Sequence, residues 1–239
     1  ALENRETNKK ALKYVNETSK ILNESVYEKS MSEIEKGKFV AVVGGDHSSP
    51  LGLIKALNDT QAQNFGILHV DAHHDLREAY EGFTYSHASI FYNAMKECEK
   101  ISNLVQIGIR DYSKEEAQRM IQYGQRSSCL YDTLMQQELA SGKSLEDVFK
   151  PYIDQLPQNV YLSIDIDGLE PLNCPNTGTP VPGGLRYGEL EHLIFMIVKS
   201  GKNIIGFDLC EVGDSADGWD ANVGARVLYQ LCGALLASQ

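Results

Sequence analysis

The chain has 239 residues, of which 42% are apolar and 23% charged, and its formal net charge is −11. This composition is typical of a globular protein and excludes a disordered or fibrous chain. The negative charge repels phosphate backbones, which disfavours a nucleic-acid partner, and it attracts small cations. The sequence has neither a signal-peptide pattern nor an apolar run of the roughly 18 residues that a membrane span needs. We therefore expect a soluble, cytoplasmic protein with no membrane partner.

Strand-length apolar runs alternate with helical patterns along the whole chain. An amphipathic helix is predicted at residues 5–27, and strands are predicted at 39–43, 66–70, 104–108, 160–164 and 204–207. Further helical patterns are found near residues 88–98, 114–123, 133–150, 187–200 and 222–237. Such alternation indicates a parallel sheet with helices on both faces. Because no linker or repeat interrupts it, residues 1–239 are predicted to form a single domain.

Acidic and histidine side chains follow four of the five predicted strands. They are His47 after the first strand, Asp71, His73 and Asp75 after the second, Asp165 and Asp167 after the fourth, and Glu211 after the fifth. Ligands of such sheets bind beyond the carboxyl ends of the strands, so these side chains should converge. Side chains alternate faces along an extended chain, which puts His74 on the opposite face from Asp71 and Asp75. We therefore do not count His74 as a ligand. His69 lies within the strand on the same face as Asp71, and we expect it to be a core histidine whose hydrogen bonds are satisfied.

Four carboxylates gathered with two imidazoles cannot all stay ionised without a counter-charge. Two divalent cations would supply it. A ligand set of oxygen and imidazole without thiolate favours manganese or a similar ion over structural zinc. Two such ions can activate a shared water as a nucleophile. Each motif alone is more often a cap or a loop acid, but burying all of these charges unpaired would cost several kcal/mol per ion.

Three segments resemble the motifs of the ureohydrolase family, which comprises arginase, agmatinase and formimidoylglutamase. They are Gly44-Gly-Asp-His-Ser48, Asp71-Ala-His-His-Asp75 and Ser163-Ile-Asp-Ile-Asp-Gly168, and Thr177-Gly-Thr-Pro180 accompanies them. The motifs occur in the family's order and spacing, and the resemblance runs from about residue 30 to the end. It implies a three-layer α/β/α fold on a mostly parallel sheet, with two Mn²⁺ ions per chain.

The resemblance also implies which side chains hold each ion. One Mn²⁺ would be bound by His47, Asp71, Asp75 and Asp165. The other would be bound by His73, Asp71, Asp165 and Asp167. Asp71 and Asp165 would then bridge the two ions.

Three side chains have catalytic roles in this resemblance. Asp75 would orient the nucleophile, and Glu211 matches the acid that pairs with the substrate guanidinium. His87 matches the histidine that passes a proton to the leaving amine, a role for which histidine is well suited. The structural alternatives are a surface-loop acid for Glu211 and a neighbour of a helix cap for His87.

The family normally begins with an additional strand and a Gly/Pro-rich segment before the first helix, whereas this chain starts at that helix. A missing strand would leave an exposed sheet edge, which a partner chain could cover. Family members are commonly trimers or hexamers. The resemblance therefore implies a homo-oligomer, which we expect to be held together by helix faces.

Substrate choice depends on a few departures from the family pattern. Arg77 and Ser113 replace an Asn and an acid of arginases, whereas residues 86–92 and 105–110 are more similar to agmatinases. Asp75-Leu-Arg77 resembles formimidoylglutamases, in which the guanidinium could bind a substrate carboxylate. The alternative for Arg77 is an ion pair with Glu78 or Glu81.

We therefore predict a manganese-dependent hydrolase of a linear guanidino or formimino compound. Agmatine is the leading substrate, and hydrolysis would release urea. Formiminoglutamate or another guanidino acid is the second choice, and arginine is less favoured. The non-enzymatic alternative is a catalytically silent family member that acts in assembly.

Overall fold

Six strands form a parallel central sheet in the order β1-β6-β5-β2-β3-β4, in a computed structural model that describes residues 2–239 and the side chains from residue 8 onward. The strands are β1 (Ala41–Val43), β2 (Phe65–Val70), β3 (Ile101–Ile107), β4 (Ser127–Leu130), β5 (Asn159–Asp165) and β6 (Asn203–Cys210). Every neighbouring pair runs parallel. The predicted parallel α/β fold is confirmed.

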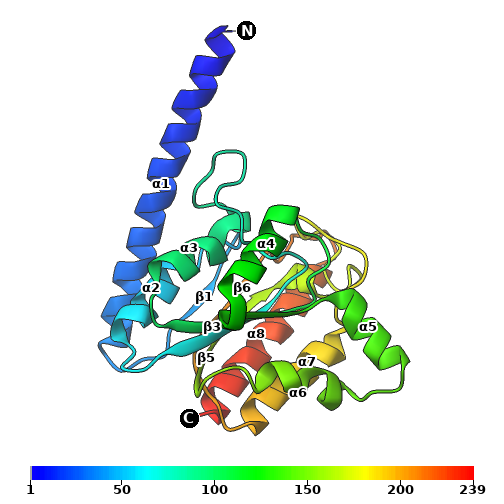
Figure 1. Cartoon of the computed structure of the whole chain (residues 1–239). Helices are drawn as coiled ribbons and strands as arrows, with labels where there is room; N and C mark the ends of the chain where they lie inside the picture. The colour runs from blue at the N-terminus through cyan, green and yellow to red at the C-terminus, as the bar shows by residue number, and fades with distance from the viewer. Residues whose placement is uncertain (1) are drawn as a thin grey trace.

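Helices cover both faces of the sheet (Figure 1). They are α1 (Leu2–Ile34), α2 (Leu51–Thr60), α3 (Ile90–Glu97), α4 (Lys114–Tyr123), α5 (Asp132–Ala140), α6 (Leu145–Ile153), α7 (Tyr187–Lys199) and α8 (Trp219–Ala237). Side chains from α1 to α4 pack in one apolar cluster against the sheet, and those from α5 to α8 pack in a second. This division gives the three layers that the sequence predicted.

Successive side chains of each strand point to opposite faces of the sheet and therefore pack in different apolar clusters. In β2, Phe65 and Ile67 pack towards α2 and α3, whereas Leu68 and Val70 belong to the cluster with α5 to α8. All of these side chains are fully or almost fully buried. Burial on both faces explains why β2 reads as a nearly continuous apolar run.

The first helix, predicted at 5–27, extends to Ile34, and two further elements differ from the sequence prediction. The sixth strand, β4, was not predicted, because Ser127-Ser-Cys-Leu130 lacks the β-branched and aromatic residues that mark strands. The helix predicted at 133–150 is two helices, α5 and α6. The chain turns at Gly142, where φ is 93°, and α6 then starts with a capping box in which Ser144 and Asp147 exchange hydrogen bonds.

β1 lies at the edge of the sheet and pairs with β6 on one side. Phe39, which precedes β1, and Val43, its last residue, are 51% and 61% exposed. The C-terminal part of α1 packs on α2, whereas its N-terminal part projects beyond the body of the molecule (Figure 1). The expected exposed edge is therefore present. No helix in the described part of the chain has the length and apolarity needed to cross a membrane.

Candidate metal centre

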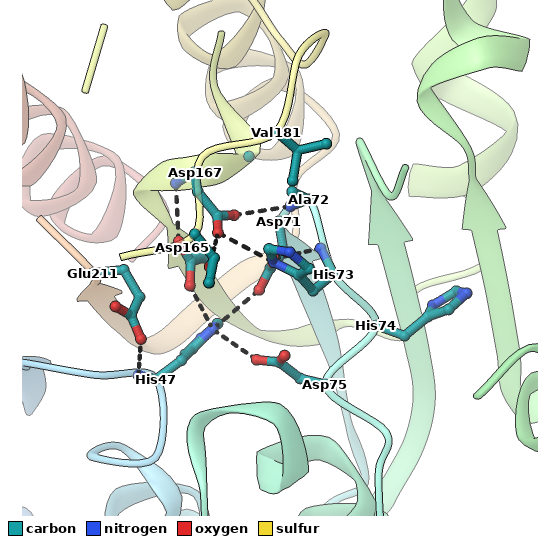
Figure 2. Close-up of polar contacts among 12 residues, drawn as sticks. His47, Asp71, Ala72, His73, His74, Asp75, Asp165, Asp167, Val181 and Glu211 are labelled. Carbon is teal, nitrogen blue, oxygen red and sulfur yellow. Dashed lines mark hydrogen bonds and ion pairs between the residues drawn. The ribbon is translucent and has the colours of Figure 1, made fainter. Parts of the chain in front are cut away.

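The carboxyl ends of four adjacent strands bring the predicted side chains together (Figure 2). His47 lies in the turn after β1, and Asp71 and Asp75 follow β2. Asp165 ends β5, and Glu211 follows β6 directly. Because the sheet order places β1, β6, β5 and β2 side by side, residues that are far apart in sequence form one cluster.

Three carboxylates converge on one nitrogen of His47. Its Nδ1 lies 3.1 Å from Asp71 Oδ2, 3.2 Å from Asp75 Oδ2 and 3.3 Å from Asp165 Oδ2. His47 is fully buried, and the three carboxylates are at most 5% exposed. These four side chains are the set predicted for one of the two ions.

His73 makes a second convergence beside the first. Its Nδ1 lies 3.1 Å from Asp167 Oδ2 and 3.3 Å from Asp71 Oδ1. Asp167 is held in place by the Ala72 amide, which donates to Oδ1 at 3.0 Å, and by the Thr179 hydroxyl, which donates to Oδ2 at 3.1 Å. The Asp71 carboxylate therefore faces His47 with one oxygen and His73 with the other, an arrangement that suits the predicted bridging role.

The carboxylates of this cluster depend on histidine for positive charge. Among the described residues, no Lys or Arg forms an ion pair with Asp71, Asp75, Asp165 or Asp167. Burial and the neighbouring Asp71 raise the pKa of Asp75 to about 8, and burial with the same neighbour raises that of Asp165. Burial opposes protonation of His73, but Asp167 and Asp71 raise its pKa to about 11. The buried carboxylates lack enough positive charge from neighbouring side chains. A set of oxygen and imidazole donors in this state fits divalent cations such as Mn²⁺.

A cleft of about 160 Å³ opens beside this cluster. It is lined by His73, Asp75, Arg77, Tyr80, His87, Ala88, Asp111, Glu116 and Thr179. His87 begins a short 3₁₀ helix (His87–Ser89), and its ring stacks edge-on to Tyr80 with centroids 5.6 Å apart. The predicted proton donor thus lines the same cleft as two predicted metal ligands.

Glu211 is anchored on the opposite side of His47 from Asp75 (Figure 2). Its Oε1 accepts a hydrogen bond from the His47 amide at 3.0 Å, and its carbonyl accepts one from the Thr177 hydroxyl at 2.8 Å. Burial raises the pKa of its carboxyl. These contacts hold Glu211 beside His47, partly buried and outside the set of residues that line the cleft, so it is not a free surface-loop acid.

Arg77 lies in the cleft wall, but its partner differs from the expected one. Its Nε lies 3.5 Å from Glu116 Oε2, and its guanidinium lies 5.0 Å from the centroid of the Tyr80 ring. The alternative of an ion pair with Glu78 or Glu81 is wrong. Glu116 is itself buried and accepts hydrogen bonds from the amide and hydroxyl of Ser113, which caps α4.

The backbone is unusual at two of the predicted site residues. Asp75 has a φ of 54° and Glu211 a φ of 63°, in the left-handed region that side chains other than glycine rarely adopt. Among the described residues, Glu81 is the third such case. Backbone strain of this kind tends to occur at functional sites, where surrounding contacts enforce it.

Sequence reasoning missed two contributors to the site. Asp111 lines the cleft from the loop after β3, which ends at Ile107, and extending the search a few residues beyond the strand end would have found it. Arg110 is held by backbone carbonyls: it donates to those of Asp167 at 2.7 Å, Val181 at 2.9 Å and Leu169 at 3.2 Å. Arg110 thereby fixes the loop that carries Asp167, a role that depends on tertiary structure and leaves no sequence signal.

The fold and the cluster together define a class: a three-layer α/β protein with a buried His/Asp site suited to two metal ions at the carboxyl edge of its sheet. The Arginase family model matches residues 6–233, so the chain belongs to the Arginase family. This membership confirms the resemblance noted in the sequence. It also supports a binuclear metal site, since binuclear metal dependence is a property of the family.

Two curated relatives illustrate the similarity. The chain is 31% identical over 208 residues to the N(1)-aminopropylagmatine ureohydrolase of Thermus thermophilus, a match that covers 87% of this chain and 66% of the relative. It is 35% identical over 190 residues to the agmatinase of Bacillus anthracis, with 77% and 59% covered. The chain therefore spans less than two thirds of the length of these relatives, 66% of one and 59% of the other.

A solved structure gives the same picture. The arginase from Medicago truncatula matches with a TM-score of 0.76 at 27% identity, over 90% of this chain and 66% of that one. The neighbours thus include proteins named as arginases as well as proteins named as agmatinases. Substrate choice in this chain therefore depends on the residues that line its cleft.

Proposed function

We propose that this chain is a manganese-dependent hydrolase that cleaves a linear guanidine with a cationic tail, of the agmatine type, and releases urea. One observation carries the proposal. The convergence of Asp71, Asp75 and Asp165 on His47 borders the cleft that His87 lines. The proposed metal ligands, the proposed proton donor and space for a small substrate therefore occur together.

The proposed cofactor is two Mn²⁺ ions per chain. The ligands would be His47, Asp71, Asp75 and Asp165 for one ion and His73, Asp71, Asp165 and Asp167 for the other. Such a pair of ions supplies a water that is acidified enough to act as a nucleophile near neutral pH. Cysteine takes no part in this set, which is consistent with a hard or borderline ion.

The side chains around the ions would bind the substrate and move protons. Glu211 would accept hydrogen bonds from the guanidinium, and Asp75 would orient the attacking oxygen. As the new C–O bond forms, the C–N bond to the substrate's chain breaks and His87 gives a proton to the leaving nitrogen. The products are urea and a primary amine, and water returns the proton that His87 has lost.

A cationic substrate tail is supported by charge and by similarity. The net charge is −11, and Asp111 adds a carboxylate to the cleft. The guanidinium of Arg77 is already opposed by Glu116, which reduces its ability to bind a substrate carboxylate. Relatives at 31% and 35% identity are named for agmatine or an aminopropyl derivative of it.

A formiminoglutamate hydrolase is the second candidate, and the observation in its favour is Arg77 in the cleft wall. If the substrate carries a carboxylate, Arg77→Ala should raise its KM about 10–100-fold, as expected for the loss of a charge-assisted hydrogen bond. Hydrolysis of agmatine should not be weakened, because that substrate has no anion to bind. Arg226→Ala, which changes an exposed arginine of α8, is the matched control.

The deciding experiment measures urea, ammonia and formamide release by the Mn²⁺-loaded protein from agmatine, arginine, guanidinobutyrate and formiminoglutamate. We expect urea, with agmatine the best substrate. Formamide from formiminoglutamate without urea from any guanidine would establish the second candidate instead. Absence of turnover with every substrate, in protein shown to hold two Mn²⁺, would favour the catalytically silent alternative.

We also propose a homo-oligomer, a trimer or hexamer, that works in the cytoplasm without a membrane or nucleic-acid partner. The exposed β1 edge and the apolar residues of α1 support the assembly. The negative net charge supports the absence of nucleic acid.

A further inference from the structure

A chain of buried polar side chains runs from the centre of the metal cluster to the far side of β3. It consists of Asp71, His69, Gln106, His74 and Tyr131. His69, Gln106 and His74 are fully buried. The proposed reaction does not use His69, Gln106 or His74. From the sequence, neither histidine was expected to be a metal ligand.

One backbone carbonyl determines how the Gln106 amide is oriented. The amide group contacts the carbonyl oxygen of His74 at 2.8 Å, and a carbonyl can only accept, so the atom facing it must be the nitrogen. The second hydrogen of that nitrogen points to His69 Nδ1, also at 2.8 Å. The amide oxygen then faces His74 Nδ1 at 2.6 Å and accepts from it.

The protonation of both rings follows from this orientation. His69 Nδ1 accepts a hydrogen bond, so the neutral ring carries its proton on Nε2 and donates it to Asp71 Oδ2 at 2.8 Å. His74 carries its proton on Nδ1, which leaves Nε2 to accept from the Tyr131 hydroxyl at 3.3 Å. Every polar atom along the path thus has a partner of the right kind, as buried networks require.

By its position alone, the ring of His69 could be a metal ligand. Donor atoms of His47, His69, Asp71 and Asp75 all lie within 4.8 Å of one another. With its proton on Nε2, however, His69 presents a donor to Asp71 and has no lone pair to offer an ion. If the proton moved to Nδ1, the Nε2 lone pair would face the cluster and compete with the Asp71 carboxylate.

We infer that Gln106 is a positioning residue of the metal centre. By fixing the proton of His69 on Nε2, it makes His69 a support for Asp71 and excludes it from the ligand set. The expected consequence is ion choice, because an oxygen-rich set suits Mn²⁺ and an added imidazole favours Zn²⁺. This inference rests on the proposed ligand role of Asp71, but not on any particular substrate.

The test replaces the amide by a carboxylate of the same shape. In Gln106→Glu no nitrogen remains to donate to His69 Nδ1, so the proton should move to Nδ1. Nitrogen NMR of the metal-free protein with labelled histidine distinguishes a protonated Nε2 from an unprotonated one. We expect His69 to change its protonated nitrogen, Mn²⁺ affinity to fall about 10–100-fold by calorimetry, and Zn²⁺ affinity to fall less.

Controls separate this role from general damage to the strand. Asn103→Asp makes the same chemical change on the same strand at a partly exposed site and should leave both readouts unchanged. If Gln106→Glu does not fold, Gln106→Met provides the second variant, since it also removes the donor and should leave the His69 proton on both nitrogens in part. The inference would be overturned if the proton of His69 stayed on Nε2 in the variant. It would also be overturned if the proton moved but the Mn²⁺ and Zn²⁺ affinities did not change.

The two readouts also keep this inference distinct from the proposed activity. Histidine protonation is measured without metal or substrate, and ion affinity is measured without turnover. A wild-type protein that hydrolyses none of the tested guanidines can therefore still support or overturn the role of Gln106.

Discussion

Asp165 joins the two halves of the candidate metal centre. Its Oδ1 accepts from the Asp167 amide at 2.9 Å, and its Oδ2 lies 3.3 Å from His47 Nδ1. Replacing it with Ala removes a proposed bridging ligand, so we expect loss of at least one Mn²⁺ and of nearly all activity. Metal analysis after dialysis measures the first effect and urea release the second. Full occupancy by two ions would contradict the assignment, and Asp154→Ala, at an exposed ion pair with Lys150, is the control.

His87 should affect turnover without affecting the metal. As the proposed proton donor, which lines the cleft and makes no hydrogen bond to the clustered carboxylates, it is expected to contribute about 10²–10⁴-fold to kcat. The prediction is that His87→Ala shows this loss with both Mn²⁺ ions retained, and that added imidazole restores part of the rate. Unchanged turnover would return His87 to a structural role.

The metal-free protein should lose stability as the pH rises. Burial and Asp71 raise the pKa of Asp75 to about 8, from an ordinary value near 4, so between these pH values the folded state binds more protons than the unfolded state. Stability from this group is complete below about pH 4 and is lost as the pH approaches 8. The raised pKa values of His47 and His73 act in the same direction at higher pH.

Thermal unfolding with and without Mn²⁺ measures this effect. Without metal, the midpoint should fall between about pH 5 and pH 8, and Asp75→Asn should flatten that dependence. Because Mn²⁺ displaces the same protons, its stabilising effect should grow with pH. A midpoint that rises with pH in the metal-free protein would show that other groups dominate.

At the scale of elements, the crossing of α1 and α2 depends on one glycine. A Cβ placed on Gly52 would lie 2.7 Å from the backbone nitrogen of Tyr27 and closer still to the carbonyl oxygen of Asn23. Gly52→Ala should therefore force the helices apart and lower stability by about 1–3 kcal/mol. Gly233→Ala in α8 meets nothing within 4 Å and should raise stability by about 0.5–1 kcal/mol. Denaturant unfolding measures the free energy of unfolding of both variants. A Gly52→Ala variant as stable as the unmodified protein would contradict the close packing of α1 on α2.

The elements that sequence predicts best are those with a strong local signal. The run Phe65–Val70 is buried on both faces, and the acids and histidines after it are placed by the geometry of a parallel sheet. β4 was missed because an edge strand of four residues needs no strongly apolar sequence. The partner of Arg77 was missed because Glu116 reaches it from the first turn of α4, and such a contact is specified only by the tertiary fold.

At the scale of the whole molecule, exposed apolar residues on α1 and β1 support the proposed assembly. Tyr14 and Ile21 on α1 are 70% and 68% exposed, and Val43 of the edge strand β1 is 61% exposed. Light scattering should give a mass that is a multiple of 26.5 kDa at micromolar concentration. Ile21→Glu should shift the mass towards that of one chain, because a charge would be buried at the helix interface, whereas Ile121→Glu on α4 should not. A monomer in the unmodified protein would contradict the prediction.

The left-handed backbone at Asp75 and Glu211 has a consequence for how this molecule could change over generations. Each such residue costs of order 1–3 kcal/mol, and glycine or asparagine would relieve the cost at the same position. Variants selected only for heat resistance should therefore gather substitutions at these two positions early. The same substitutions remove a proposed metal ligand and a proposed guanidinium acceptor, so the fold becomes more robust as its proposed chemistry is lost.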